Sequence, residues 1–161
     1  MQPVSCRDFS HIAFSCDSQR IDLQQVRDLL QIGAFWAQNR TPEDLAVALA
    51  NSEPVVTAWD GNRLMGFARV TSDGVYRATL WDVVIHPDYR GGGLGRKLVQ
   101  TALAHPKVAR VERVYLMTSS QQRFYERIGF EENLTTTMIL HNRRPAVVLP
   151  DLSLTAQPVE G

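Results

Sequence analysis

At one point the chain reads Arg90-Gly91-Gly92-Gly93-Leu94-Gly95-Arg96-Lys97, between a strand-like run at 76–85 and an amphipathic helix pattern at 94–105. Closely spaced glycines let backbone N–H groups converge without obstruction by side chains. The first turn of the helix adds unpaired N–H donors and the positive end of the helix dipole. Arg90, Arg96 and Lys97 add positive charge beside it. The stretch therefore predicts a turn that binds a pyrophosphate, with a flexible turn that only ends a strand as the alternative.

Two other phosphate-binding motifs do not fit this stretch. A P-loop has the pattern GxxxxGK followed by Ser or Thr, but Lys97 is followed by Leu98, which has no hydroxyl group for a magnesium ion. A dinucleotide-binding turn has the pattern GxGxxG, and Arg96 stands where the last glycine would be. A different phosphate-binding turn is needed to explain the stretch.

Hydrophobic periodicity and turn signals extend outward from this stretch in both directions. Asp22 and Thr41 are expected helix N-caps, Gly33 is an expected helix stop, and Asp60-Gly61 is an expected hairpin turn. We expect strands at 9–16, 54–60, 63–73, 76–85, 111–117 and 135–140, and helices at 22–33, 42–50, 94–105 and 119–128. An edge strand at 145–149 would make a seventh. The order of these elements predicts one α/β domain.

Composition restricts the class of protein. Of the 161 residues, 44% are hydrophobic, and 17 Lys and Arg balance 17 Asp and Glu. This balance argues against nucleic acid as a partner, and Cys6 and Cys16 lack the spacing of a zinc or disulfide site. No apolar run is long enough to cross a membrane and the start of the chain has no apolar signal segment, so we expect a cytoplasmic protein without a bound metal or membrane contact.

The glycine-rich stretch resembles the acyl-CoA signature R/Q-x-x-G-x-G/A of the GCN5-related N-acetyltransferase (GNAT) superfamily, which residues 90–95 match at every position. A second, distant motif at 124–130 resembles the FYxxxGF sequence that ends the GNAT core. The resemblance implies a GNAT fold, in which a mixed, mostly antiparallel sheet of six or seven strands is flanked by four helices. In that fold the strand ending at Ile85 splays from the strand at 111–117, which opens a cleft for acetyl-CoA.

The resemblance also implies which residues hold acetyl-CoA, the expected cosubstrate. Backbone groups of the strand before the turn would bind the pantetheine arm, amides of the turn the pyrophosphate, and hydroxyl groups after 111–117 further polar atoms. These predicted cofactor-binding residues are Val83, Val84, Ile85, Arg90, Gly91, Gly92, Gly93, Leu94, Gly95, Arg96, Thr118, Ser120 and Tyr125. For the two hydroxyl residues, helix capping is the alternative role.

Tyr125 and Asp82 are the expected catalytic residues. The resemblance implies that Tyr125 lies near the sulfur atom and protonates the leaving thiolate, and core packing is its alternative role. Asp82 interrupts an apolar strand, where burial would raise its pKa and suit it to act as a base. The alternatives for Asp82 are an acid on the solvent face of the strand and a structural hydrogen bond. His86 and Glu112 are reserve proton carriers.

Residues 66–99 resemble the plastid and cyanobacterial GNAT group that includes plant-type serotonin N-acetyltransferases. The resemblance implies direct transfer of an acetyl group to a primary amine in a ternary complex, with an arylalkylamine such as serotonin as the acceptor. Phe35, Trp36 and Trp81 are the candidate walls of the acceptor pocket, with packing in the core as the alternative role. The alternatives are acetylation of a protein lysine or N-terminus, and a regulatory module that binds acyl-CoA without turnover.

The expected acetyltransferase domain covers residues 1–141. After it, residues 142–161 are rich in Arg, Pro and small residues without a clear period, which predicts a loosely ordered tail. The resemblance, and the need to cover a sheet edge, make a homodimer an expected arrangement that the residues alone do not establish.

Overall fold

Five strands form one mixed sheet in the part of the chain that the computed structural model describes, residues 7–142. The strands are β1 (Ala13–Ser15), β2 (Val55–Asp60), β3 (Arg63–Ser72), β4 (Arg77–Ile85) and β5 (Arg113–Tyr115), and they lie in this order across the sheet. Neighbouring strands are antiparallel except for β4 and β5, which run parallel. A parallel pair needs a crossover connection, and the two α-helices between Ile85 and Arg113 supply it on one face of the sheet.

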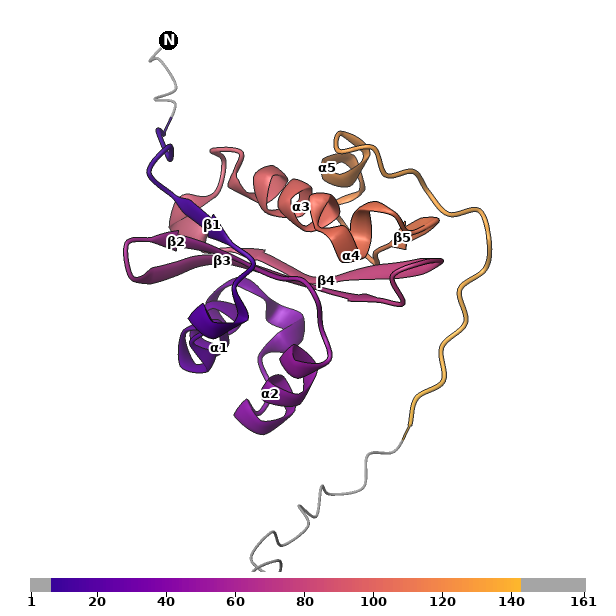
Figure 1. Ribbon diagram of the computed structural model, residues 1–161, viewed down its shortest axis with the longest axis horizontal. Coiled ribbons are helices and arrows are strands. Elements are labelled where there is room, and N and C mark those ends of the chain that lie inside the picture. The colour runs from indigo at the N-terminus through magenta and orange to yellow at the C-terminus, as the bar shows by residue number, and fades with distance from the viewer. Residues whose placement is uncertain (1–6, 143–161) are drawn as a thin grey trace, which may run out of the picture. The chain divides into compact units, whose positions relative to one another are not determined.

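Helices cover both faces of the sheet (Figure 1). α1 (Leu23–Gly33) and α2 (Pro42–Ala50) lie on one face, and α3 (Leu94–Ala104), α4 (Pro106–Ala109) and α5 (Gln122–Glu126) lie on the other. Three short 3-10 turns, η1 (Ser18–Arg20), η2 (Phe35–Ala37) and η3 (Pro87–Tyr89), connect the longer elements. Each face has its own buried cluster, with Val26, Leu30 and Phe67 on the α1 side and Met65, Leu98 and Val99 on the α3 side.

Local signals in the sequence place the ends of several elements. The Asp22 side chain accepts hydrogen bonds from two N–H groups in the first turn of α1. Thr41 accepts one at the start of α2, where Pro42 occupies the first helical position. Gly61 takes a positive φ of 57° in the hairpin between β2 and β3. These caps and this turn are therefore confirmed.

A β-bulge interrupts the pairing of β3 with β4. The register shifts between Phe67 and Arg69, and Asp82 opposite them adopts a φ of 55°, which among the described residues other than glycine is positive only here. A bulge places two consecutive side chains on the same face of the sheet. Trp81 and Asp82 accordingly both contact Arg69, on the face covered by α1 and α2.

The strand β4 pairs with β5 only over its first three residues. Arg77, Ala78 and Thr79 of β4 face the three residues of β5, and the pairing ends at Tyr115. From Leu80 to Ile85 the same edge of β4 has no strand beside it within the described chain. This opening between two parallel strands is the feature that positions the candidate site.

The expected count of six or seven strands and four helices is wrong, because the described residues form five strands and five α-helices. The expected strand at 135–140 is absent, since no neighbouring strand pairs with it and its apolar side chains are exposed. The additional helix, α4, is a single turn that starts at Pro106 and is too short to show a period. The expected strand at 145–149 and all but the first residue of the expected tail lie outside the described residues.

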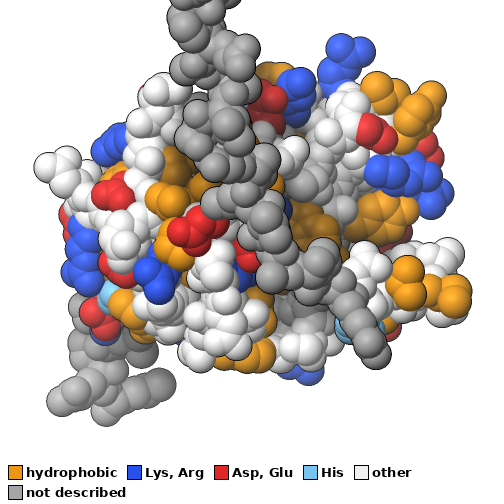
Figure 2. Space-filling model, turned by 90° about the horizontal axis from the view of Figure 1, so that it is seen from below, with side chains coloured by type: hydrophobic (Ala, Val, Ile, Leu, Met, Phe, Trp, Pro, Cys, Tyr) orange, Lys and Arg blue, Asp and Glu red, His pale blue; other side chains and the backbone are white. Residues whose placement is uncertain are grey.

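The chain divides into two units, Met1–Glu131 and Glu132–Gly161. The second unit, where the structure describes it, contains neither helix nor strand. Within residues 7–142 no helix combines the length and the apolar character needed to span a bilayer. On the face shown in Figure 2, basic and acidic side chains are interspersed and form no extended patch of one sign.

Candidate active site

A cavity of about 590 Å³ lies along the free edge of β4. Its walls come from the end of α1, the second half of β4, the glycine-rich turn, the start of α3, and α5 with the residues just after it. The predicted site residues that line it are Trp36, Val83, Val84, Ile85, Arg90, Gly91, Gly93, Leu94, Gly95, Arg96 and Tyr125. The structure thus brings together residues from both distant motifs.

The glycine-rich turn has the geometry of an anion site. Gly91 and Gly93 adopt φ values of 83° and 81°, which residues with a Cβ rarely adopt. Gly93 is the N-cap of α3 and has no side chain to satisfy the first N–H groups of the helix. Unsatisfied N–H groups at the positive end of a helix dipole attract phosphate oxygens. The turn is therefore suited to the pyrophosphate of coenzyme A.

Gly92 does not line this cavity, although it belongs to the same turn. Its open side is covered by Phe9, whose ring stacks on Tyr89 with a centroid separation of 5.4 Å. Arg7 donates a hydrogen bond from Nη1 to the carbonyl oxygen of Asp88. The segment before β1 therefore supports the turn from outside, an arrangement that no pattern within the turn predicts.

Arg90 uses its guanidinium group on backbone carbonyl groups. Its Nε donates to the oxygen of Ile85 at 3.0 Å, and its Nη2 donates to the oxygen of Gly33 at 3.2 Å. The second bond reaches the last residue of α1, where a carbonyl has no partner within the helix. Arg90 lines the cavity and also ties the glycine-rich turn to α1.

Tyr125 is half-buried in the wall opposite β4. Its ring makes edge contacts with Phe124 and Phe130, at centroid separations of 4.8 and 5.8 Å. Burial raises the pKa of the Tyr125 hydroxyl above its ordinary value of 10.0. The hydroxyl is therefore protonated at neutral pH and can donate a proton, and the ring also packs as its alternative role expects.

Asp82 lies behind the cavity wall rather than in it. Its Oδ2 accepts hydrogen bonds from Arg40 Nη1 at 2.6 Å and from Arg69 Nε at 2.7 Å. Burial alone would raise the pKa of this carboxyl, but the hydrogen bonds and charges of the two arginines outweigh burial, and the pKa falls below 3.8. The expected rise in pKa is therefore wrong, because the sequence did not reveal the two arginines.

The expected acceptor walls divide between the two sides of β4. Trp36 lines the cavity, and its ring meets that of Phe35 edge-on at 5.2 Å; both side chains are exposed, at 52% and 76%. Trp81 faces away from the cavity and donates from Nε1 to Thr71 Oγ1 at 2.8 Å. Of these three expected residues only Trp36 lines the cavity, and Phe35 packs against its ring.

The hydroxyl residues after β5 lie outside the lining. Thr118 Oγ1 accepts a hydrogen bond from the N–H of Gln121 at 3.0 Å, in the turn before α5, and no side chain caps the first N–H groups of this helix. Ser120 is exposed. In their place Gln121 and Arg127 line the cavity. Arg127 occupies a variable position within the FYxxxGF motif and Gln121 lies three positions before it, so the motif could have pointed to both.

The reserve proton carriers also lie elsewhere. His86 contacts Arg63 through Nε2 at 3.2 Å and receives a hydrogen bond from the N–H of Asp88. Glu112 pairs with Arg77 at 3.2 Å on the surface. Among the described residues no group of three or more His, Cys, Asp or Glu side chains could hold a metal ion.

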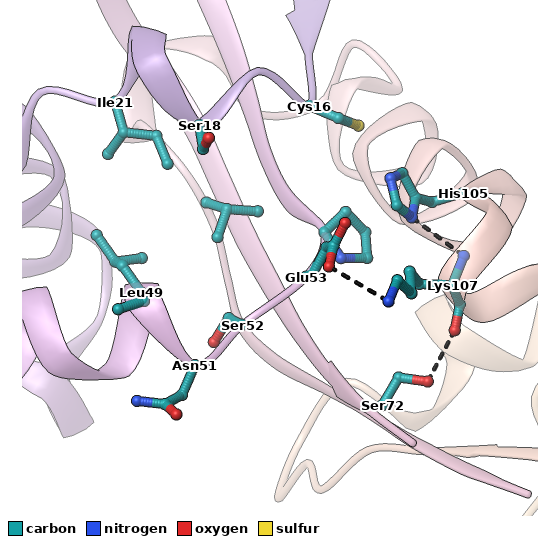
Figure 3. A pocket seen from close by; sticks show the side chains of 13 residues that line it. Cys16, Ser18, Ile21, Leu49, Asn51, Ser52, Glu53, Ser72, His105 and Lys107 are labelled. Carbon is teal, nitrogen blue, oxygen red and sulfur yellow. Dashed lines mark hydrogen bonds and ion pairs between the residues drawn. The ribbon is translucent and has the colours of Figure 1, made fainter. Parts of the chain in front are cut away.

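A second cavity, of about 620 Å³, lies at the edge of the sheet where β2 begins (Figure 3). Polar groups line it, including the ion pair of Glu53 with Lys107 at 3.7 Å and the hydrogen bond from Ser72 Oγ to the carbonyl of Lys107. None of the residues predicted from the two motifs lies in it. We therefore place the chemistry in the cavity along β4.

Comparison with known proteins identifies the family of the chain. A model of the acetyltransferase (GNAT) family matches residues 23–130. The uncharacterized N-acetyltransferase ycf52 of Pyropia yezoensis is 33% identical over 128 residues, which cover 76% of this chain and 72% of that protein. A solved acetyltransferase of the GNAT family from Xanthomonas campestris superposes with a TM-score of 0.73 at 29% identity, covering 85% of this chain and 96% of that one.

Two further relatives differ in the acceptors that their names specify. The histone acetyltransferase TAP1 of Glycine max is 36% identical over 122 residues, covering 68% of this chain and 51% of that protein. The chloroplastic serotonin N-acetyltransferase 2 of Oryza sativa subsp. japonica is 34% identical over 96 residues, covering 56% of this chain and 48% of that protein. The names of these two relatives thus specify different acceptors, a histone and serotonin.

Proposed function

This chain belongs to the acetyltransferase (GNAT) family, and on that premise we propose that it transfers an acetyl group from acetyl-CoA to a primary amine in the cavity along β4. The observation that carries the proposal is the meeting of Gly91, Gly93 and Tyr125 in one cavity beside a strand edge that has free backbone groups. The first two supply an anion-binding turn, and the third supplies a protonated hydroxyl.

The turn and the strand edge offer groups that would bind two parts of coenzyme A. Amides of the glycine-rich turn would hold the pyrophosphate, and Arg96 in the first turn of α3 adds positive charge on the same side. The free edge of Val83–Ile85 would pair with the amide groups of the pantetheine arm, as a strand edge pairs with an added strand. When bound, acetyl-CoA supplies an acetyl thioester.

The proposed reaction is direct acyl transfer. The amine nitrogen forms a bond to the thioester carbonyl carbon, the C–S bond breaks, and the coenzyme leaves as a thiolate. An N–H group on the free edge of β4 would stabilise the oxyanion that develops on the carbonyl oxygen, and Tyr125 would give its proton to the thiolate. The nitrogen is positively charged after the attack and would lose its extra proton to water, from which Tyr125 regains its own. No covalent bond to the protein is needed.

The attacking amine must first lose a proton, because an alkylammonium group has a pKa of about 10. Water that reaches the open cavity would accept this proton. Asp82 is the alternative base, and its lowered pKa weakens that assignment, since a carboxylate held by two arginines binds a proton poorly. The lowered pKa thus favours the water route.

An arylalkylamine is the acceptor that we propose first. The exposed rings of Phe35 and Trp36 at the opening can stack on an aromatic acceptor, and the serotonin N-acetyltransferase of Oryza sativa is a relative. The histone acetyltransferase of Glycine max supports a protein acceptor as the second candidate. A cytoplasmic location and a homodimer stay predictions.

The test is thiol release from acetyl-CoA with a panel of acceptors. The panel contains serotonin, tyramine, a polyamine and lysine peptides, and the matched variant is Tyr125→Phe. Turnover of arylalkylamines that collapses in the variant supports the proposal. Turnover of peptides alone would move the assignment to a protein acetyltransferase. Tight coenzyme A binding without turnover of any acceptor would overturn the enzymatic role in favour of a regulatory one.

A further inference from the structure

The segment between α1 and α2 carries the two exposed aromatic rings at the cavity opening. We call residues 34–39 the aromatic wall. Ala34 and Ala37 of this wall are buried, at 1% and 3% exposure, in the cluster beneath α1, while Phe35 and Trp36 point outward. The wall is a single 3-10 turn between two longer helices, so its position depends on how its ends are held.

Both ends of the aromatic wall are attached to β4 or to the turn after it. Before the wall, the carbonyl of Gly33 accepts a hydrogen bond from Arg90, which is also bonded to Ile85. After the wall, Arg40 donates to Asp82 at 2.6 Å. The aromatic wall is therefore linked at both ends by hydrogen bonds to β4, the strand along which acetyl-CoA would bind.

The attachment at Asp82 is built into the core of the protein. The Asp82 side chain is 3% exposed and that of Arg69 is 14% exposed, whereas that of Arg40 is 32% exposed. Arg69 also donates to Ser52 Oγ and lies over the ring of Trp81. One oxygen atom of Asp82 thus accepts from both arginines, the largely buried Arg69 and the more exposed Arg40.

The backbone at Asp82 supports a functional reading. A positive φ at a residue other than glycine costs free energy, and such positions persist where the surrounding structure requires them. Here the carboxylate of the bulge residue bonds Arg40 and Arg69 and does not line the cavity. The strained residue, Asp82, therefore binds Arg40 and does not contact the reacting atoms.

From this geometry we propose that Arg40 is a positioning residue: its ion pair with Asp82 holds the aromatic wall where Trp36 can contact the ring of the acceptor. The inference rests on the proposed function, because it assigns a role within acceptor binding. The proposal also makes Asp82 a positioning residue and not the base that removes a proton from the amine.

Acceptor kinetics of Arg40→Gln, Arg40→Lys and Asp82→Asn test the proposal, with Arg110→Gln as the matched control. Arg110 is exposed at the end of α4, a helix that contributes nothing to the cavity lining. In Arg40→Gln we expect the KM for an arylalkylamine to rise about tenfold, with kcat and the KM for acetyl-CoA little changed. Arg40→Lys should recover part of the loss, and a small polyamine without a ring should be unaffected.

A double-mutant cycle separates positioning from base catalysis. If Asp82 acts through Arg40, the Arg40→Gln/Asp82→Asn double variant loses no more than the worse single variant, and the pH profile of kcat keeps its shape. If Asp82→Asn instead abolishes kcat for every acceptor and removes a limb of the pH profile, the proposal is overturned. Losses in Arg40→Gln that the polyamine shares would overturn it as well.

Hydrogen exchange gives a readout that needs no turnover. Amides of residues 34–40 should exchange faster in Arg40→Gln than in the parent protein, and near the parent rate in Arg40→Lys and Arg110→Gln. Unchanged exchange in Arg40→Gln would overturn the proposal even if a good acceptor were found. If Arg40→Gln exchanges faster but the parent protein acetylates no acceptor, the result would support the role of Arg40 in holding the aromatic wall. The proposed function would then be overturned separately.

Discussion

The ring of Phe9 occupies the space into which a side chain at Gly92 would project. Gly92→Ala should therefore displace Phe9 and break its stacking on Tyr89, which lowers the free energy of unfolding by about 1 kcal/mol. Urea unfolding measures this loss. In a Phe9→Ala background the same substitution should cost much less, because the overlapping ring is gone; an equal cost in both backgrounds would show that Phe9 is not the cause.

Removing the hydroxyl of Tyr125 should affect the chemical step and leave cofactor binding intact. We expect Tyr125→Phe to lower kcat about a hundredfold, the usual contribution of a general acid, with little change in the KM for acetyl-CoA. Because burial raises the pKa of Tyr125 above 10.0, the parent enzyme should lose no activity from its deprotonation up to about pH 10. Tyr76→Phe, at an exposed site, is the control. Full activity in Tyr125→Phe would exclude the acid role.

The ion pairs of Asp82 should make part of the stability depend on pH. Its folded-state pKa lies below 3.8, so the contribution is present above about pH 4 and is lost as the pH falls through the folded-state value. Asp82→Asn leaves Arg69 largely buried without an anionic partner and should cost about 3 kcal/mol at pH 7. Urea unfolding between pH 7 and pH 3 should show the two proteins converging at the acid end. A difference that is constant with pH would contradict the ion-pair explanation.

The contact of α1 with β4 leaves no room for a side chain at Gly33. A Cβ there would overlap Cγ2 of Val84, a buried residue in the cavity wall. Gly33→Ala should lower the free energy of unfolding by about 2 kcal/mol, because a packed core does not accept an added methyl group. With Val84→Ala the cost should shrink, so the two substitutions should be strongly non-additive in a double-mutant cycle. Simple additivity would mean that the helix moves instead of the side chain.

Several features of the site followed from residues that are close together in the sequence. The glycine-rich turn, the start of α3 at Leu94 and the hairpin at Gly61 depend on φ preferences and capping within a few positions. The placement of Tyr125 in the cavity followed from the resemblance of its motif and not from periodicity, since an aromatic residue with this spacing packs equally well in a core.

The pairing of residues far apart could not be predicted in the same way. Arg40 and Asp82 are 42 positions apart, and Gly33 and Arg90 are 57 apart. Arg40 lies in a polar segment and Asp82 in an apolar strand, and nothing in the sequence around either residue indicates that the two side chains pair. The error in the direction of the Asp82 pKa follows directly, because burial was evident from the apolar neighbours and the two cations were not.

The α/β class, the caps and turns, and the turn that suits a pyrophosphate can be predicted from the amino-acid sequence, because these features depend on the short-range stereochemistry of the backbone. The number of strands, the bulge at Asp82 and the hydrogen bonds of Arg90 to backbone carbonyl groups became known from the folded structure. Hydrogen bonds and ion pairs between distant segments form only when the sheet and helices have packed, because packing fixes which side chains meet.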